Sequence, residues 1–206
     1  MKKNVLSIHP YYFSPQKRIF DVFVSIFLLV VAAPLLLIIS VLILVTMGSP
    51  IFFTQLRSGK NKKPFAIYKF RTMHKSAEKL RYKLNARNEA PFPMFKMMND
   101  PRFVGIGKWL SQIGFDELPQ LVNVLTGDMS LIGPRPLPVA EADLLDQSWD
   151  FRYSVRPGIF SEWAADETKH DSLKHWKTIE ENMLNRGSLL HDINIIVMIM
   201  KMLLKK

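Results

Sequence analysis

The stretch IFDVFVSIFLLVVAAPLLLIISVLILVTM, residues 19–47, decides how this chain folds. Asp21 is its only ionisable residue, and the run exceeds the roughly 20 apolar residues that cross a bilayer as a helix. The run is also too long for a secretory signal, and no small-x-small cleavage pattern follows it at Met47-Gly48-Ser49-Pro50. The sequence therefore predicts a helix that inserts into a membrane.

The predicted helix either crosses the membrane or enters and leaves it by the same face. Pro34 lies near the middle of the run, where it removes a backbone hydrogen bond and clashes with the preceding turn. Basic residues flank both ends: Lys2, Lys3, Lys17 and Arg18 precede the run, and Arg57, Lys60, Lys62, Lys63, Lys69 and Arg71 follow it. Because lysine and arginine favour the cytoplasmic side, both ends qualify for that side. We expect a re-entrant helix–break–helix at Pro34, with a spanning helix as the alternative.

Asp21 is the one acidic residue at the entry to this run. It follows Lys17 and Arg18 by about one helical turn, so pairing with them softens its cost at the membrane interface. We interpret it as an interfacial anchor without a catalytic role.

The charge balance points to an anionic partner. The formal net charge is +10 and the isoelectric point is about 9.8. An apolar block beside basic clusters favours a membrane surface, while the basic residues form no known motif for reading nucleic acid. The chain has no Cys, which excludes disulfides, thiolate metal sites and Cys nucleophiles.

The rest of the chain predicts an α+β domain that is mostly helical. Residues 1–48 form the predicted membrane-associated segment, and residues 49–206 the predicted globular domain. Strands are expected at Ile51–Leu56 and Phe65–Phe70, and a polar helical stretch at 74–90. The apolar stretch Ile193–Leu204 is too short to span and predicts an interfacial or core-docked helix, with a basic tip at Lys205-Lys206.

The string Asp116-Glu117-Leu118-Pro119-Gln120 is the most informative motif for chemistry. Pro119 fits the first turn of a helix and Gly127 fits its C-terminal cap. Between them Leu118, Leu121, Val122 and Leu125 follow helical spacing and predict one buried stripe. The acidic pair is therefore expected at a helix N-terminus.

A helix N-terminus favours ionised carboxylates and phosphate groups. An ionised carboxylate can act as a nucleophile on phosphorus or bind Mg²⁺, although plain N-capping by an acidic residue is the common alternative. Arg135 stands between Pro134 and Pro136, and Arg102 follows Asp100-Pro101; each is a candidate for gripping a planar anion. Together these residues predict a diphosphate–metal site, where positioning and charge neutralisation do most of the catalysis.

Several strings together resemble the bacterial sugar transferase family, the monotopic phosphoglycosyl transferases that begin polyprenol-linked glycan assembly. Each string is weak alone, and the set is highly specific. The strings cover most of residues 17–160, in order and at compatible spacing: Lys17-Arg18-Ile19-Phe20-Asp21, Lys69-Phe70-Arg71-Thr72-Met73, Asp100-Pro101-Arg102, Asp116-Glu117-Leu118-Pro119-Gln120, Gly127 to Pro136, and Arg156-Pro157-Gly158-Ile159. By length the chain resembles the small form that consists of the catalytic domain alone.

The resemblance implies a ping-pong reaction. Asp116 would attack the sugar-bearing phosphorus of a UDP-sugar, release UMP and hold the sugar phosphate covalently. Undecaprenyl phosphate would then accept this group and become an undecaprenyl-diphosphate sugar. Glu117 would bind Mg²⁺, Arg135 would hold phosphate, and Arg102, Lys69 and Arg71 would lie near the anions.

The resemblance also implies a place and partners. Residues 49–206 would form a cytosolic catalytic domain that rests on the membrane surface with interfacial amphipathic helices. This domain would lie on the cytoplasmic face of the bacterial inner membrane, in contact with inner-leaflet phospholipid and without nucleic acid. A homodimer, the identity of the sugar and the glycan pathway are left open.

Two departures from the family pattern matter. The family often has Ser before the membrane proline, where this chain has Ala33, so the bend would rely on Pro34 and its packing. After Ile159 the family's usual Thr-Gly-x-Ala-Gln-like string is replaced by Phe160-Ser161-Glu162-Trp163-Ala164-Ala165-Asp166, and residues 160–190 match only loosely. These departures leave the identity of the sugar open.

The rival interpretation is a non-catalytic, membrane-anchored basic protein that binds anionic lipid or a partner. It leaves the region from Asp116 to Pro136 unexplained.

Overall fold

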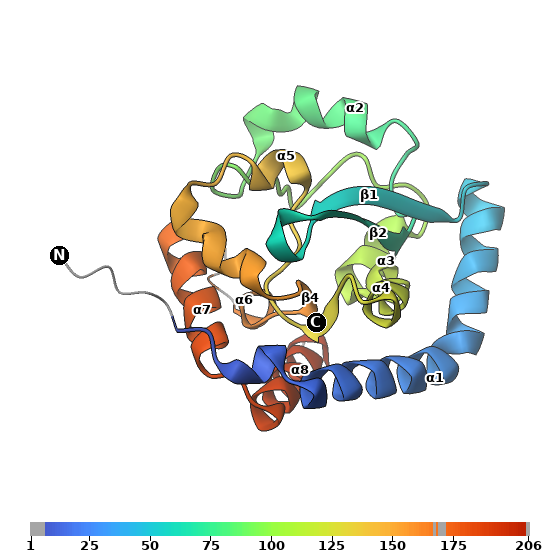
Figure 1. The fold of residues 1–206 in the computed structure, drawn as a ribbon. Helices are drawn as coiled ribbons and strands as arrows, with labels where there is room; N and C mark the ends of the chain where they lie inside the picture. The colour runs from blue at the N-terminus through green and yellow to red at the C-terminus, as the bar shows by residue number, and fades with distance from the viewer. Residues whose placement is uncertain (1–6, 167, 169–171, 205–206) are drawn as a thin grey trace.

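The computed structural model describes residues 7–166, 168 and 172–204, so the predicted basic residues Lys2, Lys3, Lys205 and Lys206 lie outside the described residues. Eight α-helices and four short strands occur in the described part of the chain (Figure 1). The helices are α1 Pro15–Met47, α2 Ala77–Arg81, α3 Gly107–Ile113, α4 Gln120–Thr126, α5 Val139–Ala142, α6 Glu162–Ala165, α7 Leu173–Asn185 and α8 Leu189–Leu204. The strands are β1 Phe52–Ser58, β2 Pro64–Phe70, β3 Ser130–Ile132 and β4 Gly158–Phe160. Short 3-10 helices lie at Pro10–Phe13, Lys60–Lys62, Tyr82–Arg87, Phe115–Glu117 and Gln147–Ser154.

Helix α1 is one bent helix of 33 residues with Pro34 inside it. The ribbon turns sharply about midway along α1, so that its two halves follow two sides of the molecule (Figure 1). A straight helix of this length would extend roughly 50 Å. The helix is continuous through Pro34, so the expected break between two helices is not seen and α1 bends instead.

Both halves of α1 pack on the same globular part. In the first half, Phe20 and Val24 pack against the main core. In the second half, Ile39 and Ile43 are buried in a cluster with Phe70. The bend therefore brings one apolar helix around one domain.

Hydrogen bonds from two arginines hold the two ends of α1 against the globular part. Arg18 lies in α1 itself, and Arg71 lies in the globular part. Arg18 Nη1 and Nη2 donate to the carbonyls of Val124 and Leu125, at 2.6 and 3.0 Å, where α4 ends. Arg71 donates to carbonyls at and just after the end of α1: Met47 at 2.7 Å, Ser49 at 3.1 Å, and Gly48. Guanidinium groups suit these positions because the C-terminal carbonyls of a helix carry partial negative charge.

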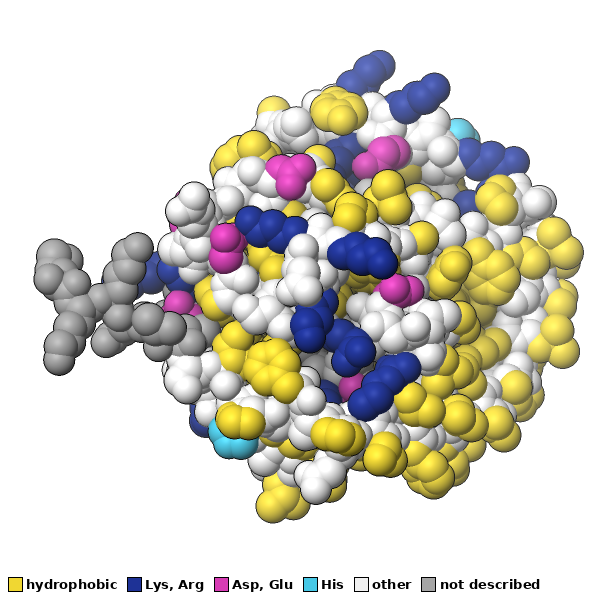
Figure 2. All heavy atoms as spheres, in the orientation of Figure 1, with side chains coloured by type: hydrophobic (Ala, Val, Ile, Leu, Met, Phe, Trp, Pro, Cys, Tyr) yellow, Lys and Arg dark blue, Asp and Glu magenta, His cyan; other side chains and the backbone are white. Residues whose placement is uncertain are grey.

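The outer face of α1 is apolar and exposed. Among the described residues α1 alone is long and apolar enough to cross a membrane, and only 11% of its most apolar window is buried. Hydrophobic side chains gather along the sides of the molecule that α1 follows (Figure 2). An exposed apolar surface of this extent is typical of a membrane or protein contact.

A buried ionic network fixes the start of α1. Lys17 Nζ lies 2.8 Å from Asp21 Oδ1 and 2.6 Å from Asp192 Oδ2 of α8. Asp21 also accepts hydrogen bonds from Ser130 Oγ at 2.7 Å and from the Leu131 amide at 3.2 Å. Asp21 was expected to lie at the interface with both basic residues. It is buried and pairs with Lys17, because β3 supplies donors for it, while Arg18 turns to α4.

The β1–β2 hairpin confirms both predicted strands. It is antiparallel, with Phe53 opposite Lys69 and Arg57 opposite Phe65. The polar stretch 74–90 contains α2 and the 3-10 helix Tyr82–Arg87. Strands β3 and β4 form a separate parallel pair, in which Ser130 pairs with Gly158 and Ile132 with Phe160.

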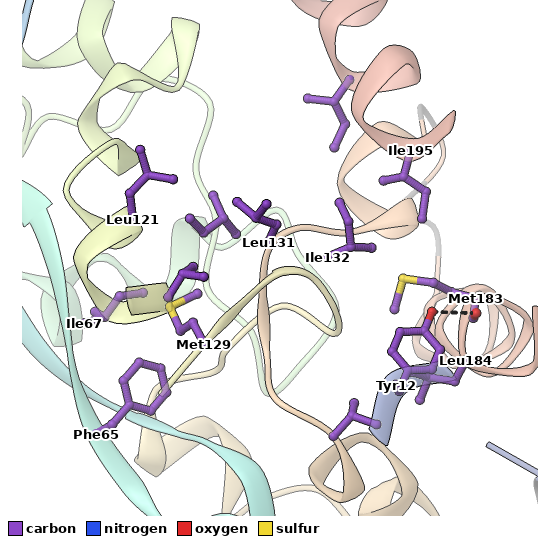
Figure 3. Close-up of a cluster of buried hydrophobic side chains, with 14 residues drawn as sticks. Tyr12, Phe65, Ile67, Leu121, Met129, Leu131, Ile132, Met183, Leu184 and Ile195 are labelled. Atoms are coloured by element: carbon purple, nitrogen blue, oxygen red, sulfur yellow. Dashed lines mark hydrogen bonds between the residues drawn. The ribbon is translucent and has the colours of Figure 1, made fainter. Parts of the chain in front are cut away.

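The main core surrounds β3 (Figure 3). Leu131 and Ile132 lie between Leu121 of α4 and Ile195 of α8, and all four side chains are buried. Tyr12 closes one side of the core and donates to the Met183 carbonyl at 2.9 Å. The C-terminal helix, expected from Ile193, begins at Leu189 and docks on this core with one face.

The predicted buried stripe on α4 is wrong. Leu121 is buried, but Val122 is 42% exposed, and the face toward the core is instead made of Gln120, Leu121, Asn123 and Val124. Asn123 sets this orientation because its side chain accepts from the Tyr68 amide at 3.0 Å and donates to the Ala66 carbonyl at 2.8 Å. The predicted cap at Gly127 is confirmed, with a left-handed φ of 92°.

Candidate active site

The acidic pair lies in a turn between α3 and α4. Gly114, with a left-handed φ of 77°, ends α3 and lets the chain reverse into the 3-10 helix Phe115–Glu117. Helix α4 then starts at Gln120, so the pair precedes the helix in a turn of its own, a few residues before the predicted position at its N-terminus. Asp116 is buried, while the Glu117 side chain is 21% exposed.

Two cations from separate elements meet Glu117. Lys69 Nζ, from β2, lies 2.5 Å from Glu117 Oε1, and Arg135 Nη2, from the loop after β3, lies 3.2 Å from the same oxygen. The structure therefore brings together four of the predicted site residues. They are Asp116, Glu117, Lys69 and Arg135.

The two carboxyl groups have different electrostatic environments. Burial raises the pKa of Asp116 to about 6; the charge of Lys69 opposes this shift, and that of Glu117 adds to it. Burial also disfavours the charged form of Glu117, but the charges and hydrogen bonds of Lys69 and Arg135 outweigh it and lower the pKa of Glu117 to about 2. Adjacent carboxyl groups whose pKa values separate in this way take different chemical roles. Glu117 is therefore ionised well below neutral pH, while Asp116 takes up a proton near pH 6.

A buried clamp holds the backbone of Arg135. Arg152 Nη2 donates to the Arg135 carbonyl at 2.6 Å and to Glu180 Oε1 at 3.0 Å. Trp176 Nε1 donates to the same Glu180 oxygen at 3.0 Å. The Arg152 guanidinium lies 4.9 Å from the centroid of the Trp176 ring, and both residues are buried. Helix α7 therefore supports the arginine that contacts Glu117.

Arg102 and Arg71 make other contacts. Arg102 binds both oxygens of Asp100, with Nη2 to Oδ2 at 2.6 Å and Nε to Oδ1 at 2.9 Å. Arg71 caps the end of α1, as described above. Both guanidinium groups are thus engaged by groups of the protein, and their assignment as phosphate ligands stays a prediction.

The residues present fit a divalent metal ion only if a substrate supplies some of its ligands. No cluster of three metal-ligating side chains occurs within the described ranges. Mg²⁺ commonly binds through one or two carboxylates and the phosphate oxygens of a substrate. Glu117 suits that arrangement because it is ionised, partly exposed, and contacts its two cations through Oε1, which leaves Oε2 as the candidate metal ligand.

Sequence reasoning missed Arg152, Glu180 and Arg57. Arg57 Nη1 donates to the Pro136 carbonyl at 3.0 Å, directly beside Arg135. Arg152 and Glu180 are 28 residues apart and share no local motif. For Arg57, the expected hairpin was the one available signal, because it places the strand before Arg57 beside the strand that contains Lys69.

Comparison with known proteins decides the family. A family model described as bacterial sugar transferase matches residues 12–206. The chain belongs to the bacterial sugar transferase family. Among its relatives, the galactosyl transferase CpsE of Streptococcus agalactiae is 37% identical over 158 residues, which cover 76% of this chain and 35% of CpsE.

Two further relatives differ in length. The exopolysaccharide production protein ExoY of Sinorhizobium fredii is 32% identical over 185 residues, 88% of this chain and 82% of ExoY. The undecaprenyl-phosphate glucose phosphotransferase of Komagataeibacter xylinus is 34% identical over 198 residues, 90% of this chain and 35% of that protein. The chain thus spans about a third of the longer relatives and most of ExoY.

Proposed function

We propose that this sugar transferase moves a sugar 1-phosphate from a UDP-sugar to undecaprenyl phosphate through a covalent intermediate on Asp116. Relatives named for undecaprenyl phosphate support this acceptor. The observation that carries the chemistry is the buried Asp116 beside an ionised Glu117 that Lys69 and Arg135 hold in place. This arrangement suits attack on phosphorus among anions.

In the first half-reaction, an Asp116 carboxylate oxygen forms a bond to the sugar-bearing phosphorus. The bond from that phosphorus to the bridging oxygen breaks, and its electron pair leaves with UMP. Lys69 and Arg135 neutralise the phosphate oxygens and align them with the carboxylate.

In the second half-reaction, a phosphate oxygen of undecaprenyl phosphate attacks the same phosphorus. The bond to Asp116 breaks and returns the carboxylate, so the products are the undecaprenyl-diphosphate sugar and a regenerated enzyme. No proton transfer is needed when both nucleophiles enter as anions. The half-reactions share one site, which explains why a single cluster of cations suffices.

Glu117 Oε2 is the proposed protein ligand of Mg²⁺, with the remaining ligands from substrate phosphates and water. When bound, the ion would neutralise charge on the phosphate oxygens. The side chains of Lys69 and Arg135 keep Glu117 ionised, so they maintain the ligand in its binding form.

The bilayer arrangement we propose is re-entrant, on the cytoplasmic face of the inner membrane. Both ends of α1 contact the same domain, through Arg18 at one end and Arg71 at the other. A spanning helix would place its ends on opposite faces, roughly 30 Å apart. The exposed apolar face of α1 would then contact inner-leaflet phospholipid.

Release of UMP tests the proposed reaction. Detergent-solubilised protein should release UMP from at least one UDP-sugar of a panel when Mg²⁺ and undecaprenyl phosphate are present. Absence of release with every donor would favour the rival, a non-catalytic membrane-anchored protein that binds anionic lipid or a partner.

The rate of UMP release should depend on the ionisation of Asp116. Its raised pKa of about 6 means that the nucleophile is ionised above that pH and protonated below it. We expect the rate to fall about tenfold for each pH unit below 6 and to level off above 7. Rates under single-turnover conditions measure this, with thermal unfolding at each pH as the control. A rate that stays constant down to pH 4.5 would contradict the pKa assignment.

Glu180 should act through Arg135. The Glu180→Gln substitution keeps the shape of the side chain but removes the charge that holds Arg152, so Arg135 loses its fixed position. We expect the rate of UMP release to fall about tenfold or more. The acidic limb of its pH–rate profile should move to higher pH because Arg135 lowers the pKa of Asp116. Glu181→Gln, on the next position of α7, is the control and should leave both values unchanged. If the acidic limb of the pH–rate profile does not move in Glu180→Gln, the role of Glu180 is purely structural.

Single-cysteine labelling tests the topology. The chain has no Cys, so Ser7→Cys and Asn61→Cys, both exposed and on either side of α1, each provide one reactive thiol. A membrane-impermeant maleimide should label both from the cytoplasmic side of sealed vesicles. Labelling of the two positions from opposite sides would establish a spanning helix.

A further inference from the structure

Arg57 extends the cation cluster along the hairpin. Phe53 pairs with Lys69, and Arg57 lies four residues further along β1 on the same face, roughly 13 Å away. Arg57 Nη1 donates to the Pro136 carbonyl at 3.0 Å, which places its guanidinium beside Arg135. The order along the site is therefore Lys69 and Glu117, then Arg135, then Arg57.

The Arg57 guanidinium is short of anionic partners. Within the described part of the chain it makes no ion pair within 4.0 Å, and its buried Nε has no hydrogen-bond partner. Among acidic groups, Glu141 raises the pKa of Arg57 most, but Arg81 already contacts Glu141 at 2.5 Å. Glu117 is engaged by Lys69 and Arg135.

Two guanidinium groups in proximity favour an anion between them. Burial and, next in size, the charge of Arg135 lower the pKa of Arg57 to about 10. Like charges that are packed together repel, and a ligand that accepts hydrogen bonds from both relieves this cost. A phosphate group has the charge and the acceptor oxygens for this role.

We infer that Arg57, beside Arg135, binds the phosphate of the leaving nucleotide. This assignment rests on the proposed transfer reaction. The phosphorus under attack must lie about 3–3.5 Å from the Asp116 oxygen, in the region whose charges are those of Lys69, Glu117 and Arg135. The second phosphate of the donor then extends past Arg135 toward Arg57.

The leaving phosphate gains negative charge as the bond breaks. The electron pair of the broken bond stays on the bridging oxygen, which departs with UMP. A cation at that position stabilises the transition state more than the bound substrate, so it accelerates the first half-reaction. The second half-reaction has no leaving nucleotide and should not depend on Arg57.

Ping-pong kinetics separate the two half-reactions. For Arg57→Gln we expect kcat/KM for the UDP-sugar to fall about 10- to 100-fold, the size of a lost hydrogen bond between charged groups. The kcat/KM for undecaprenyl phosphate should stay within about twofold of the wild-type value. Lys63→Gln, which removes an exposed charge from the same hairpin turn, is the matched control and should change neither.

Other outcomes overturn the inference. An equal fall in both constants would assign Arg57 to the transferred phosphate or to folding, and a fall for the lipid alone would assign it to the acceptor. No fall would exclude a role. If Arg57→Gln is unstable, Arg57→Lys is the deciding variant. Lysine keeps the positive charge but lacks the second hydrogen-bonding nitrogen, so we expect a smaller fall that is confined to kcat/KM for the UDP-sugar.

Binding of UMP separates this inference from the proposed reaction. Calorimetric titration of UMP into the wild-type protein and Arg57→Gln should show affinity weakened about 10- to 100-fold in the variant. Equal affinity would overturn the role of Arg57. A wild-type protein that turns over no donor contradicts the proposed function, while the UMP titration still tests Arg57.

Discussion

Asp116→Asn should abolish the release of UMP from every donor that the wild-type protein uses. The amide has nearly the shape of the carboxylate but lacks the negative charge and cannot form the acyl phosphate. Removal of a covalent nucleophile commonly costs about 10³-fold or more. Measured with Mg²⁺ and undecaprenyl phosphate present, the residual rate should not exceed the background without enzyme.

The neighbouring carboxyl group provides the comparison. Glu117→Gln should also slow the reaction, but it leaves the nucleophile in place, so a covalent sugar phosphate should still form slowly. Asp116→Asn should form none. The interpretation of Asp116 as the nucleophile would be contradicted if Asp116→Asn kept a substantial rate while Glu117→Gln lost it completely.

Lys17→Met should cause the largest loss of stability. Lys17 lies between Asp21 and Asp192, and all three side chains are almost completely buried. Methionine keeps the length of the side chain but leaves two carboxylates without a cation. Breaking a buried ion pair by removing one partner costs about 3–5 kcal/mol. We expect a lower free energy of unfolding in detergent, measured by chemical denaturation.

A second lysine serves as the control. Lys62 pairs with Asp150 at 2.7 Å, but both side chains are more than half exposed. Lys62→Met should therefore change stability little, because exposed pairs are screened by solvent. The double variant Lys17→Met with Asp192→Asn should regain part of the loss. Equal effects of Lys17→Met and Lys62→Met would show that the buried network does not hold α1.

The sequence predicted the features that depend on short-range pattern. The long apolar run, both strands of the hairpin and the cap at Gly127 all follow from local spacing and turn chemistry. Side chains from β2 and from the loop after β3 converge on the acidic turn, as the motifs indicated. Four of the predicted site residues therefore meet in space.

Features set by tertiary contacts could not be read from the sequence. The buried face of α4 depends on Asn123, which binds the backbone of β2 and turns Val122 outward. Arg71 and Arg102 have motifs that suit anions, yet the structure gives them a helix end and Asp100. The Arg152–Glu180 clamp joins distant segments through a buried ion pair. Each case needs the position of a partner that no local pattern specifies.

Intact-protein mass spectrometry tests the central claim most directly. The wild-type protein is incubated with each UDP-sugar and Mg²⁺, without undecaprenyl phosphate. The proposed mechanism predicts a mass increase of one sugar phosphate, located on the peptide that contains Asp116, and its disappearance when undecaprenyl phosphate is added. No adduct under conditions where the complete mixture transfers sugar phosphate would contradict the covalent intermediate and indicate direct transfer to the lipid.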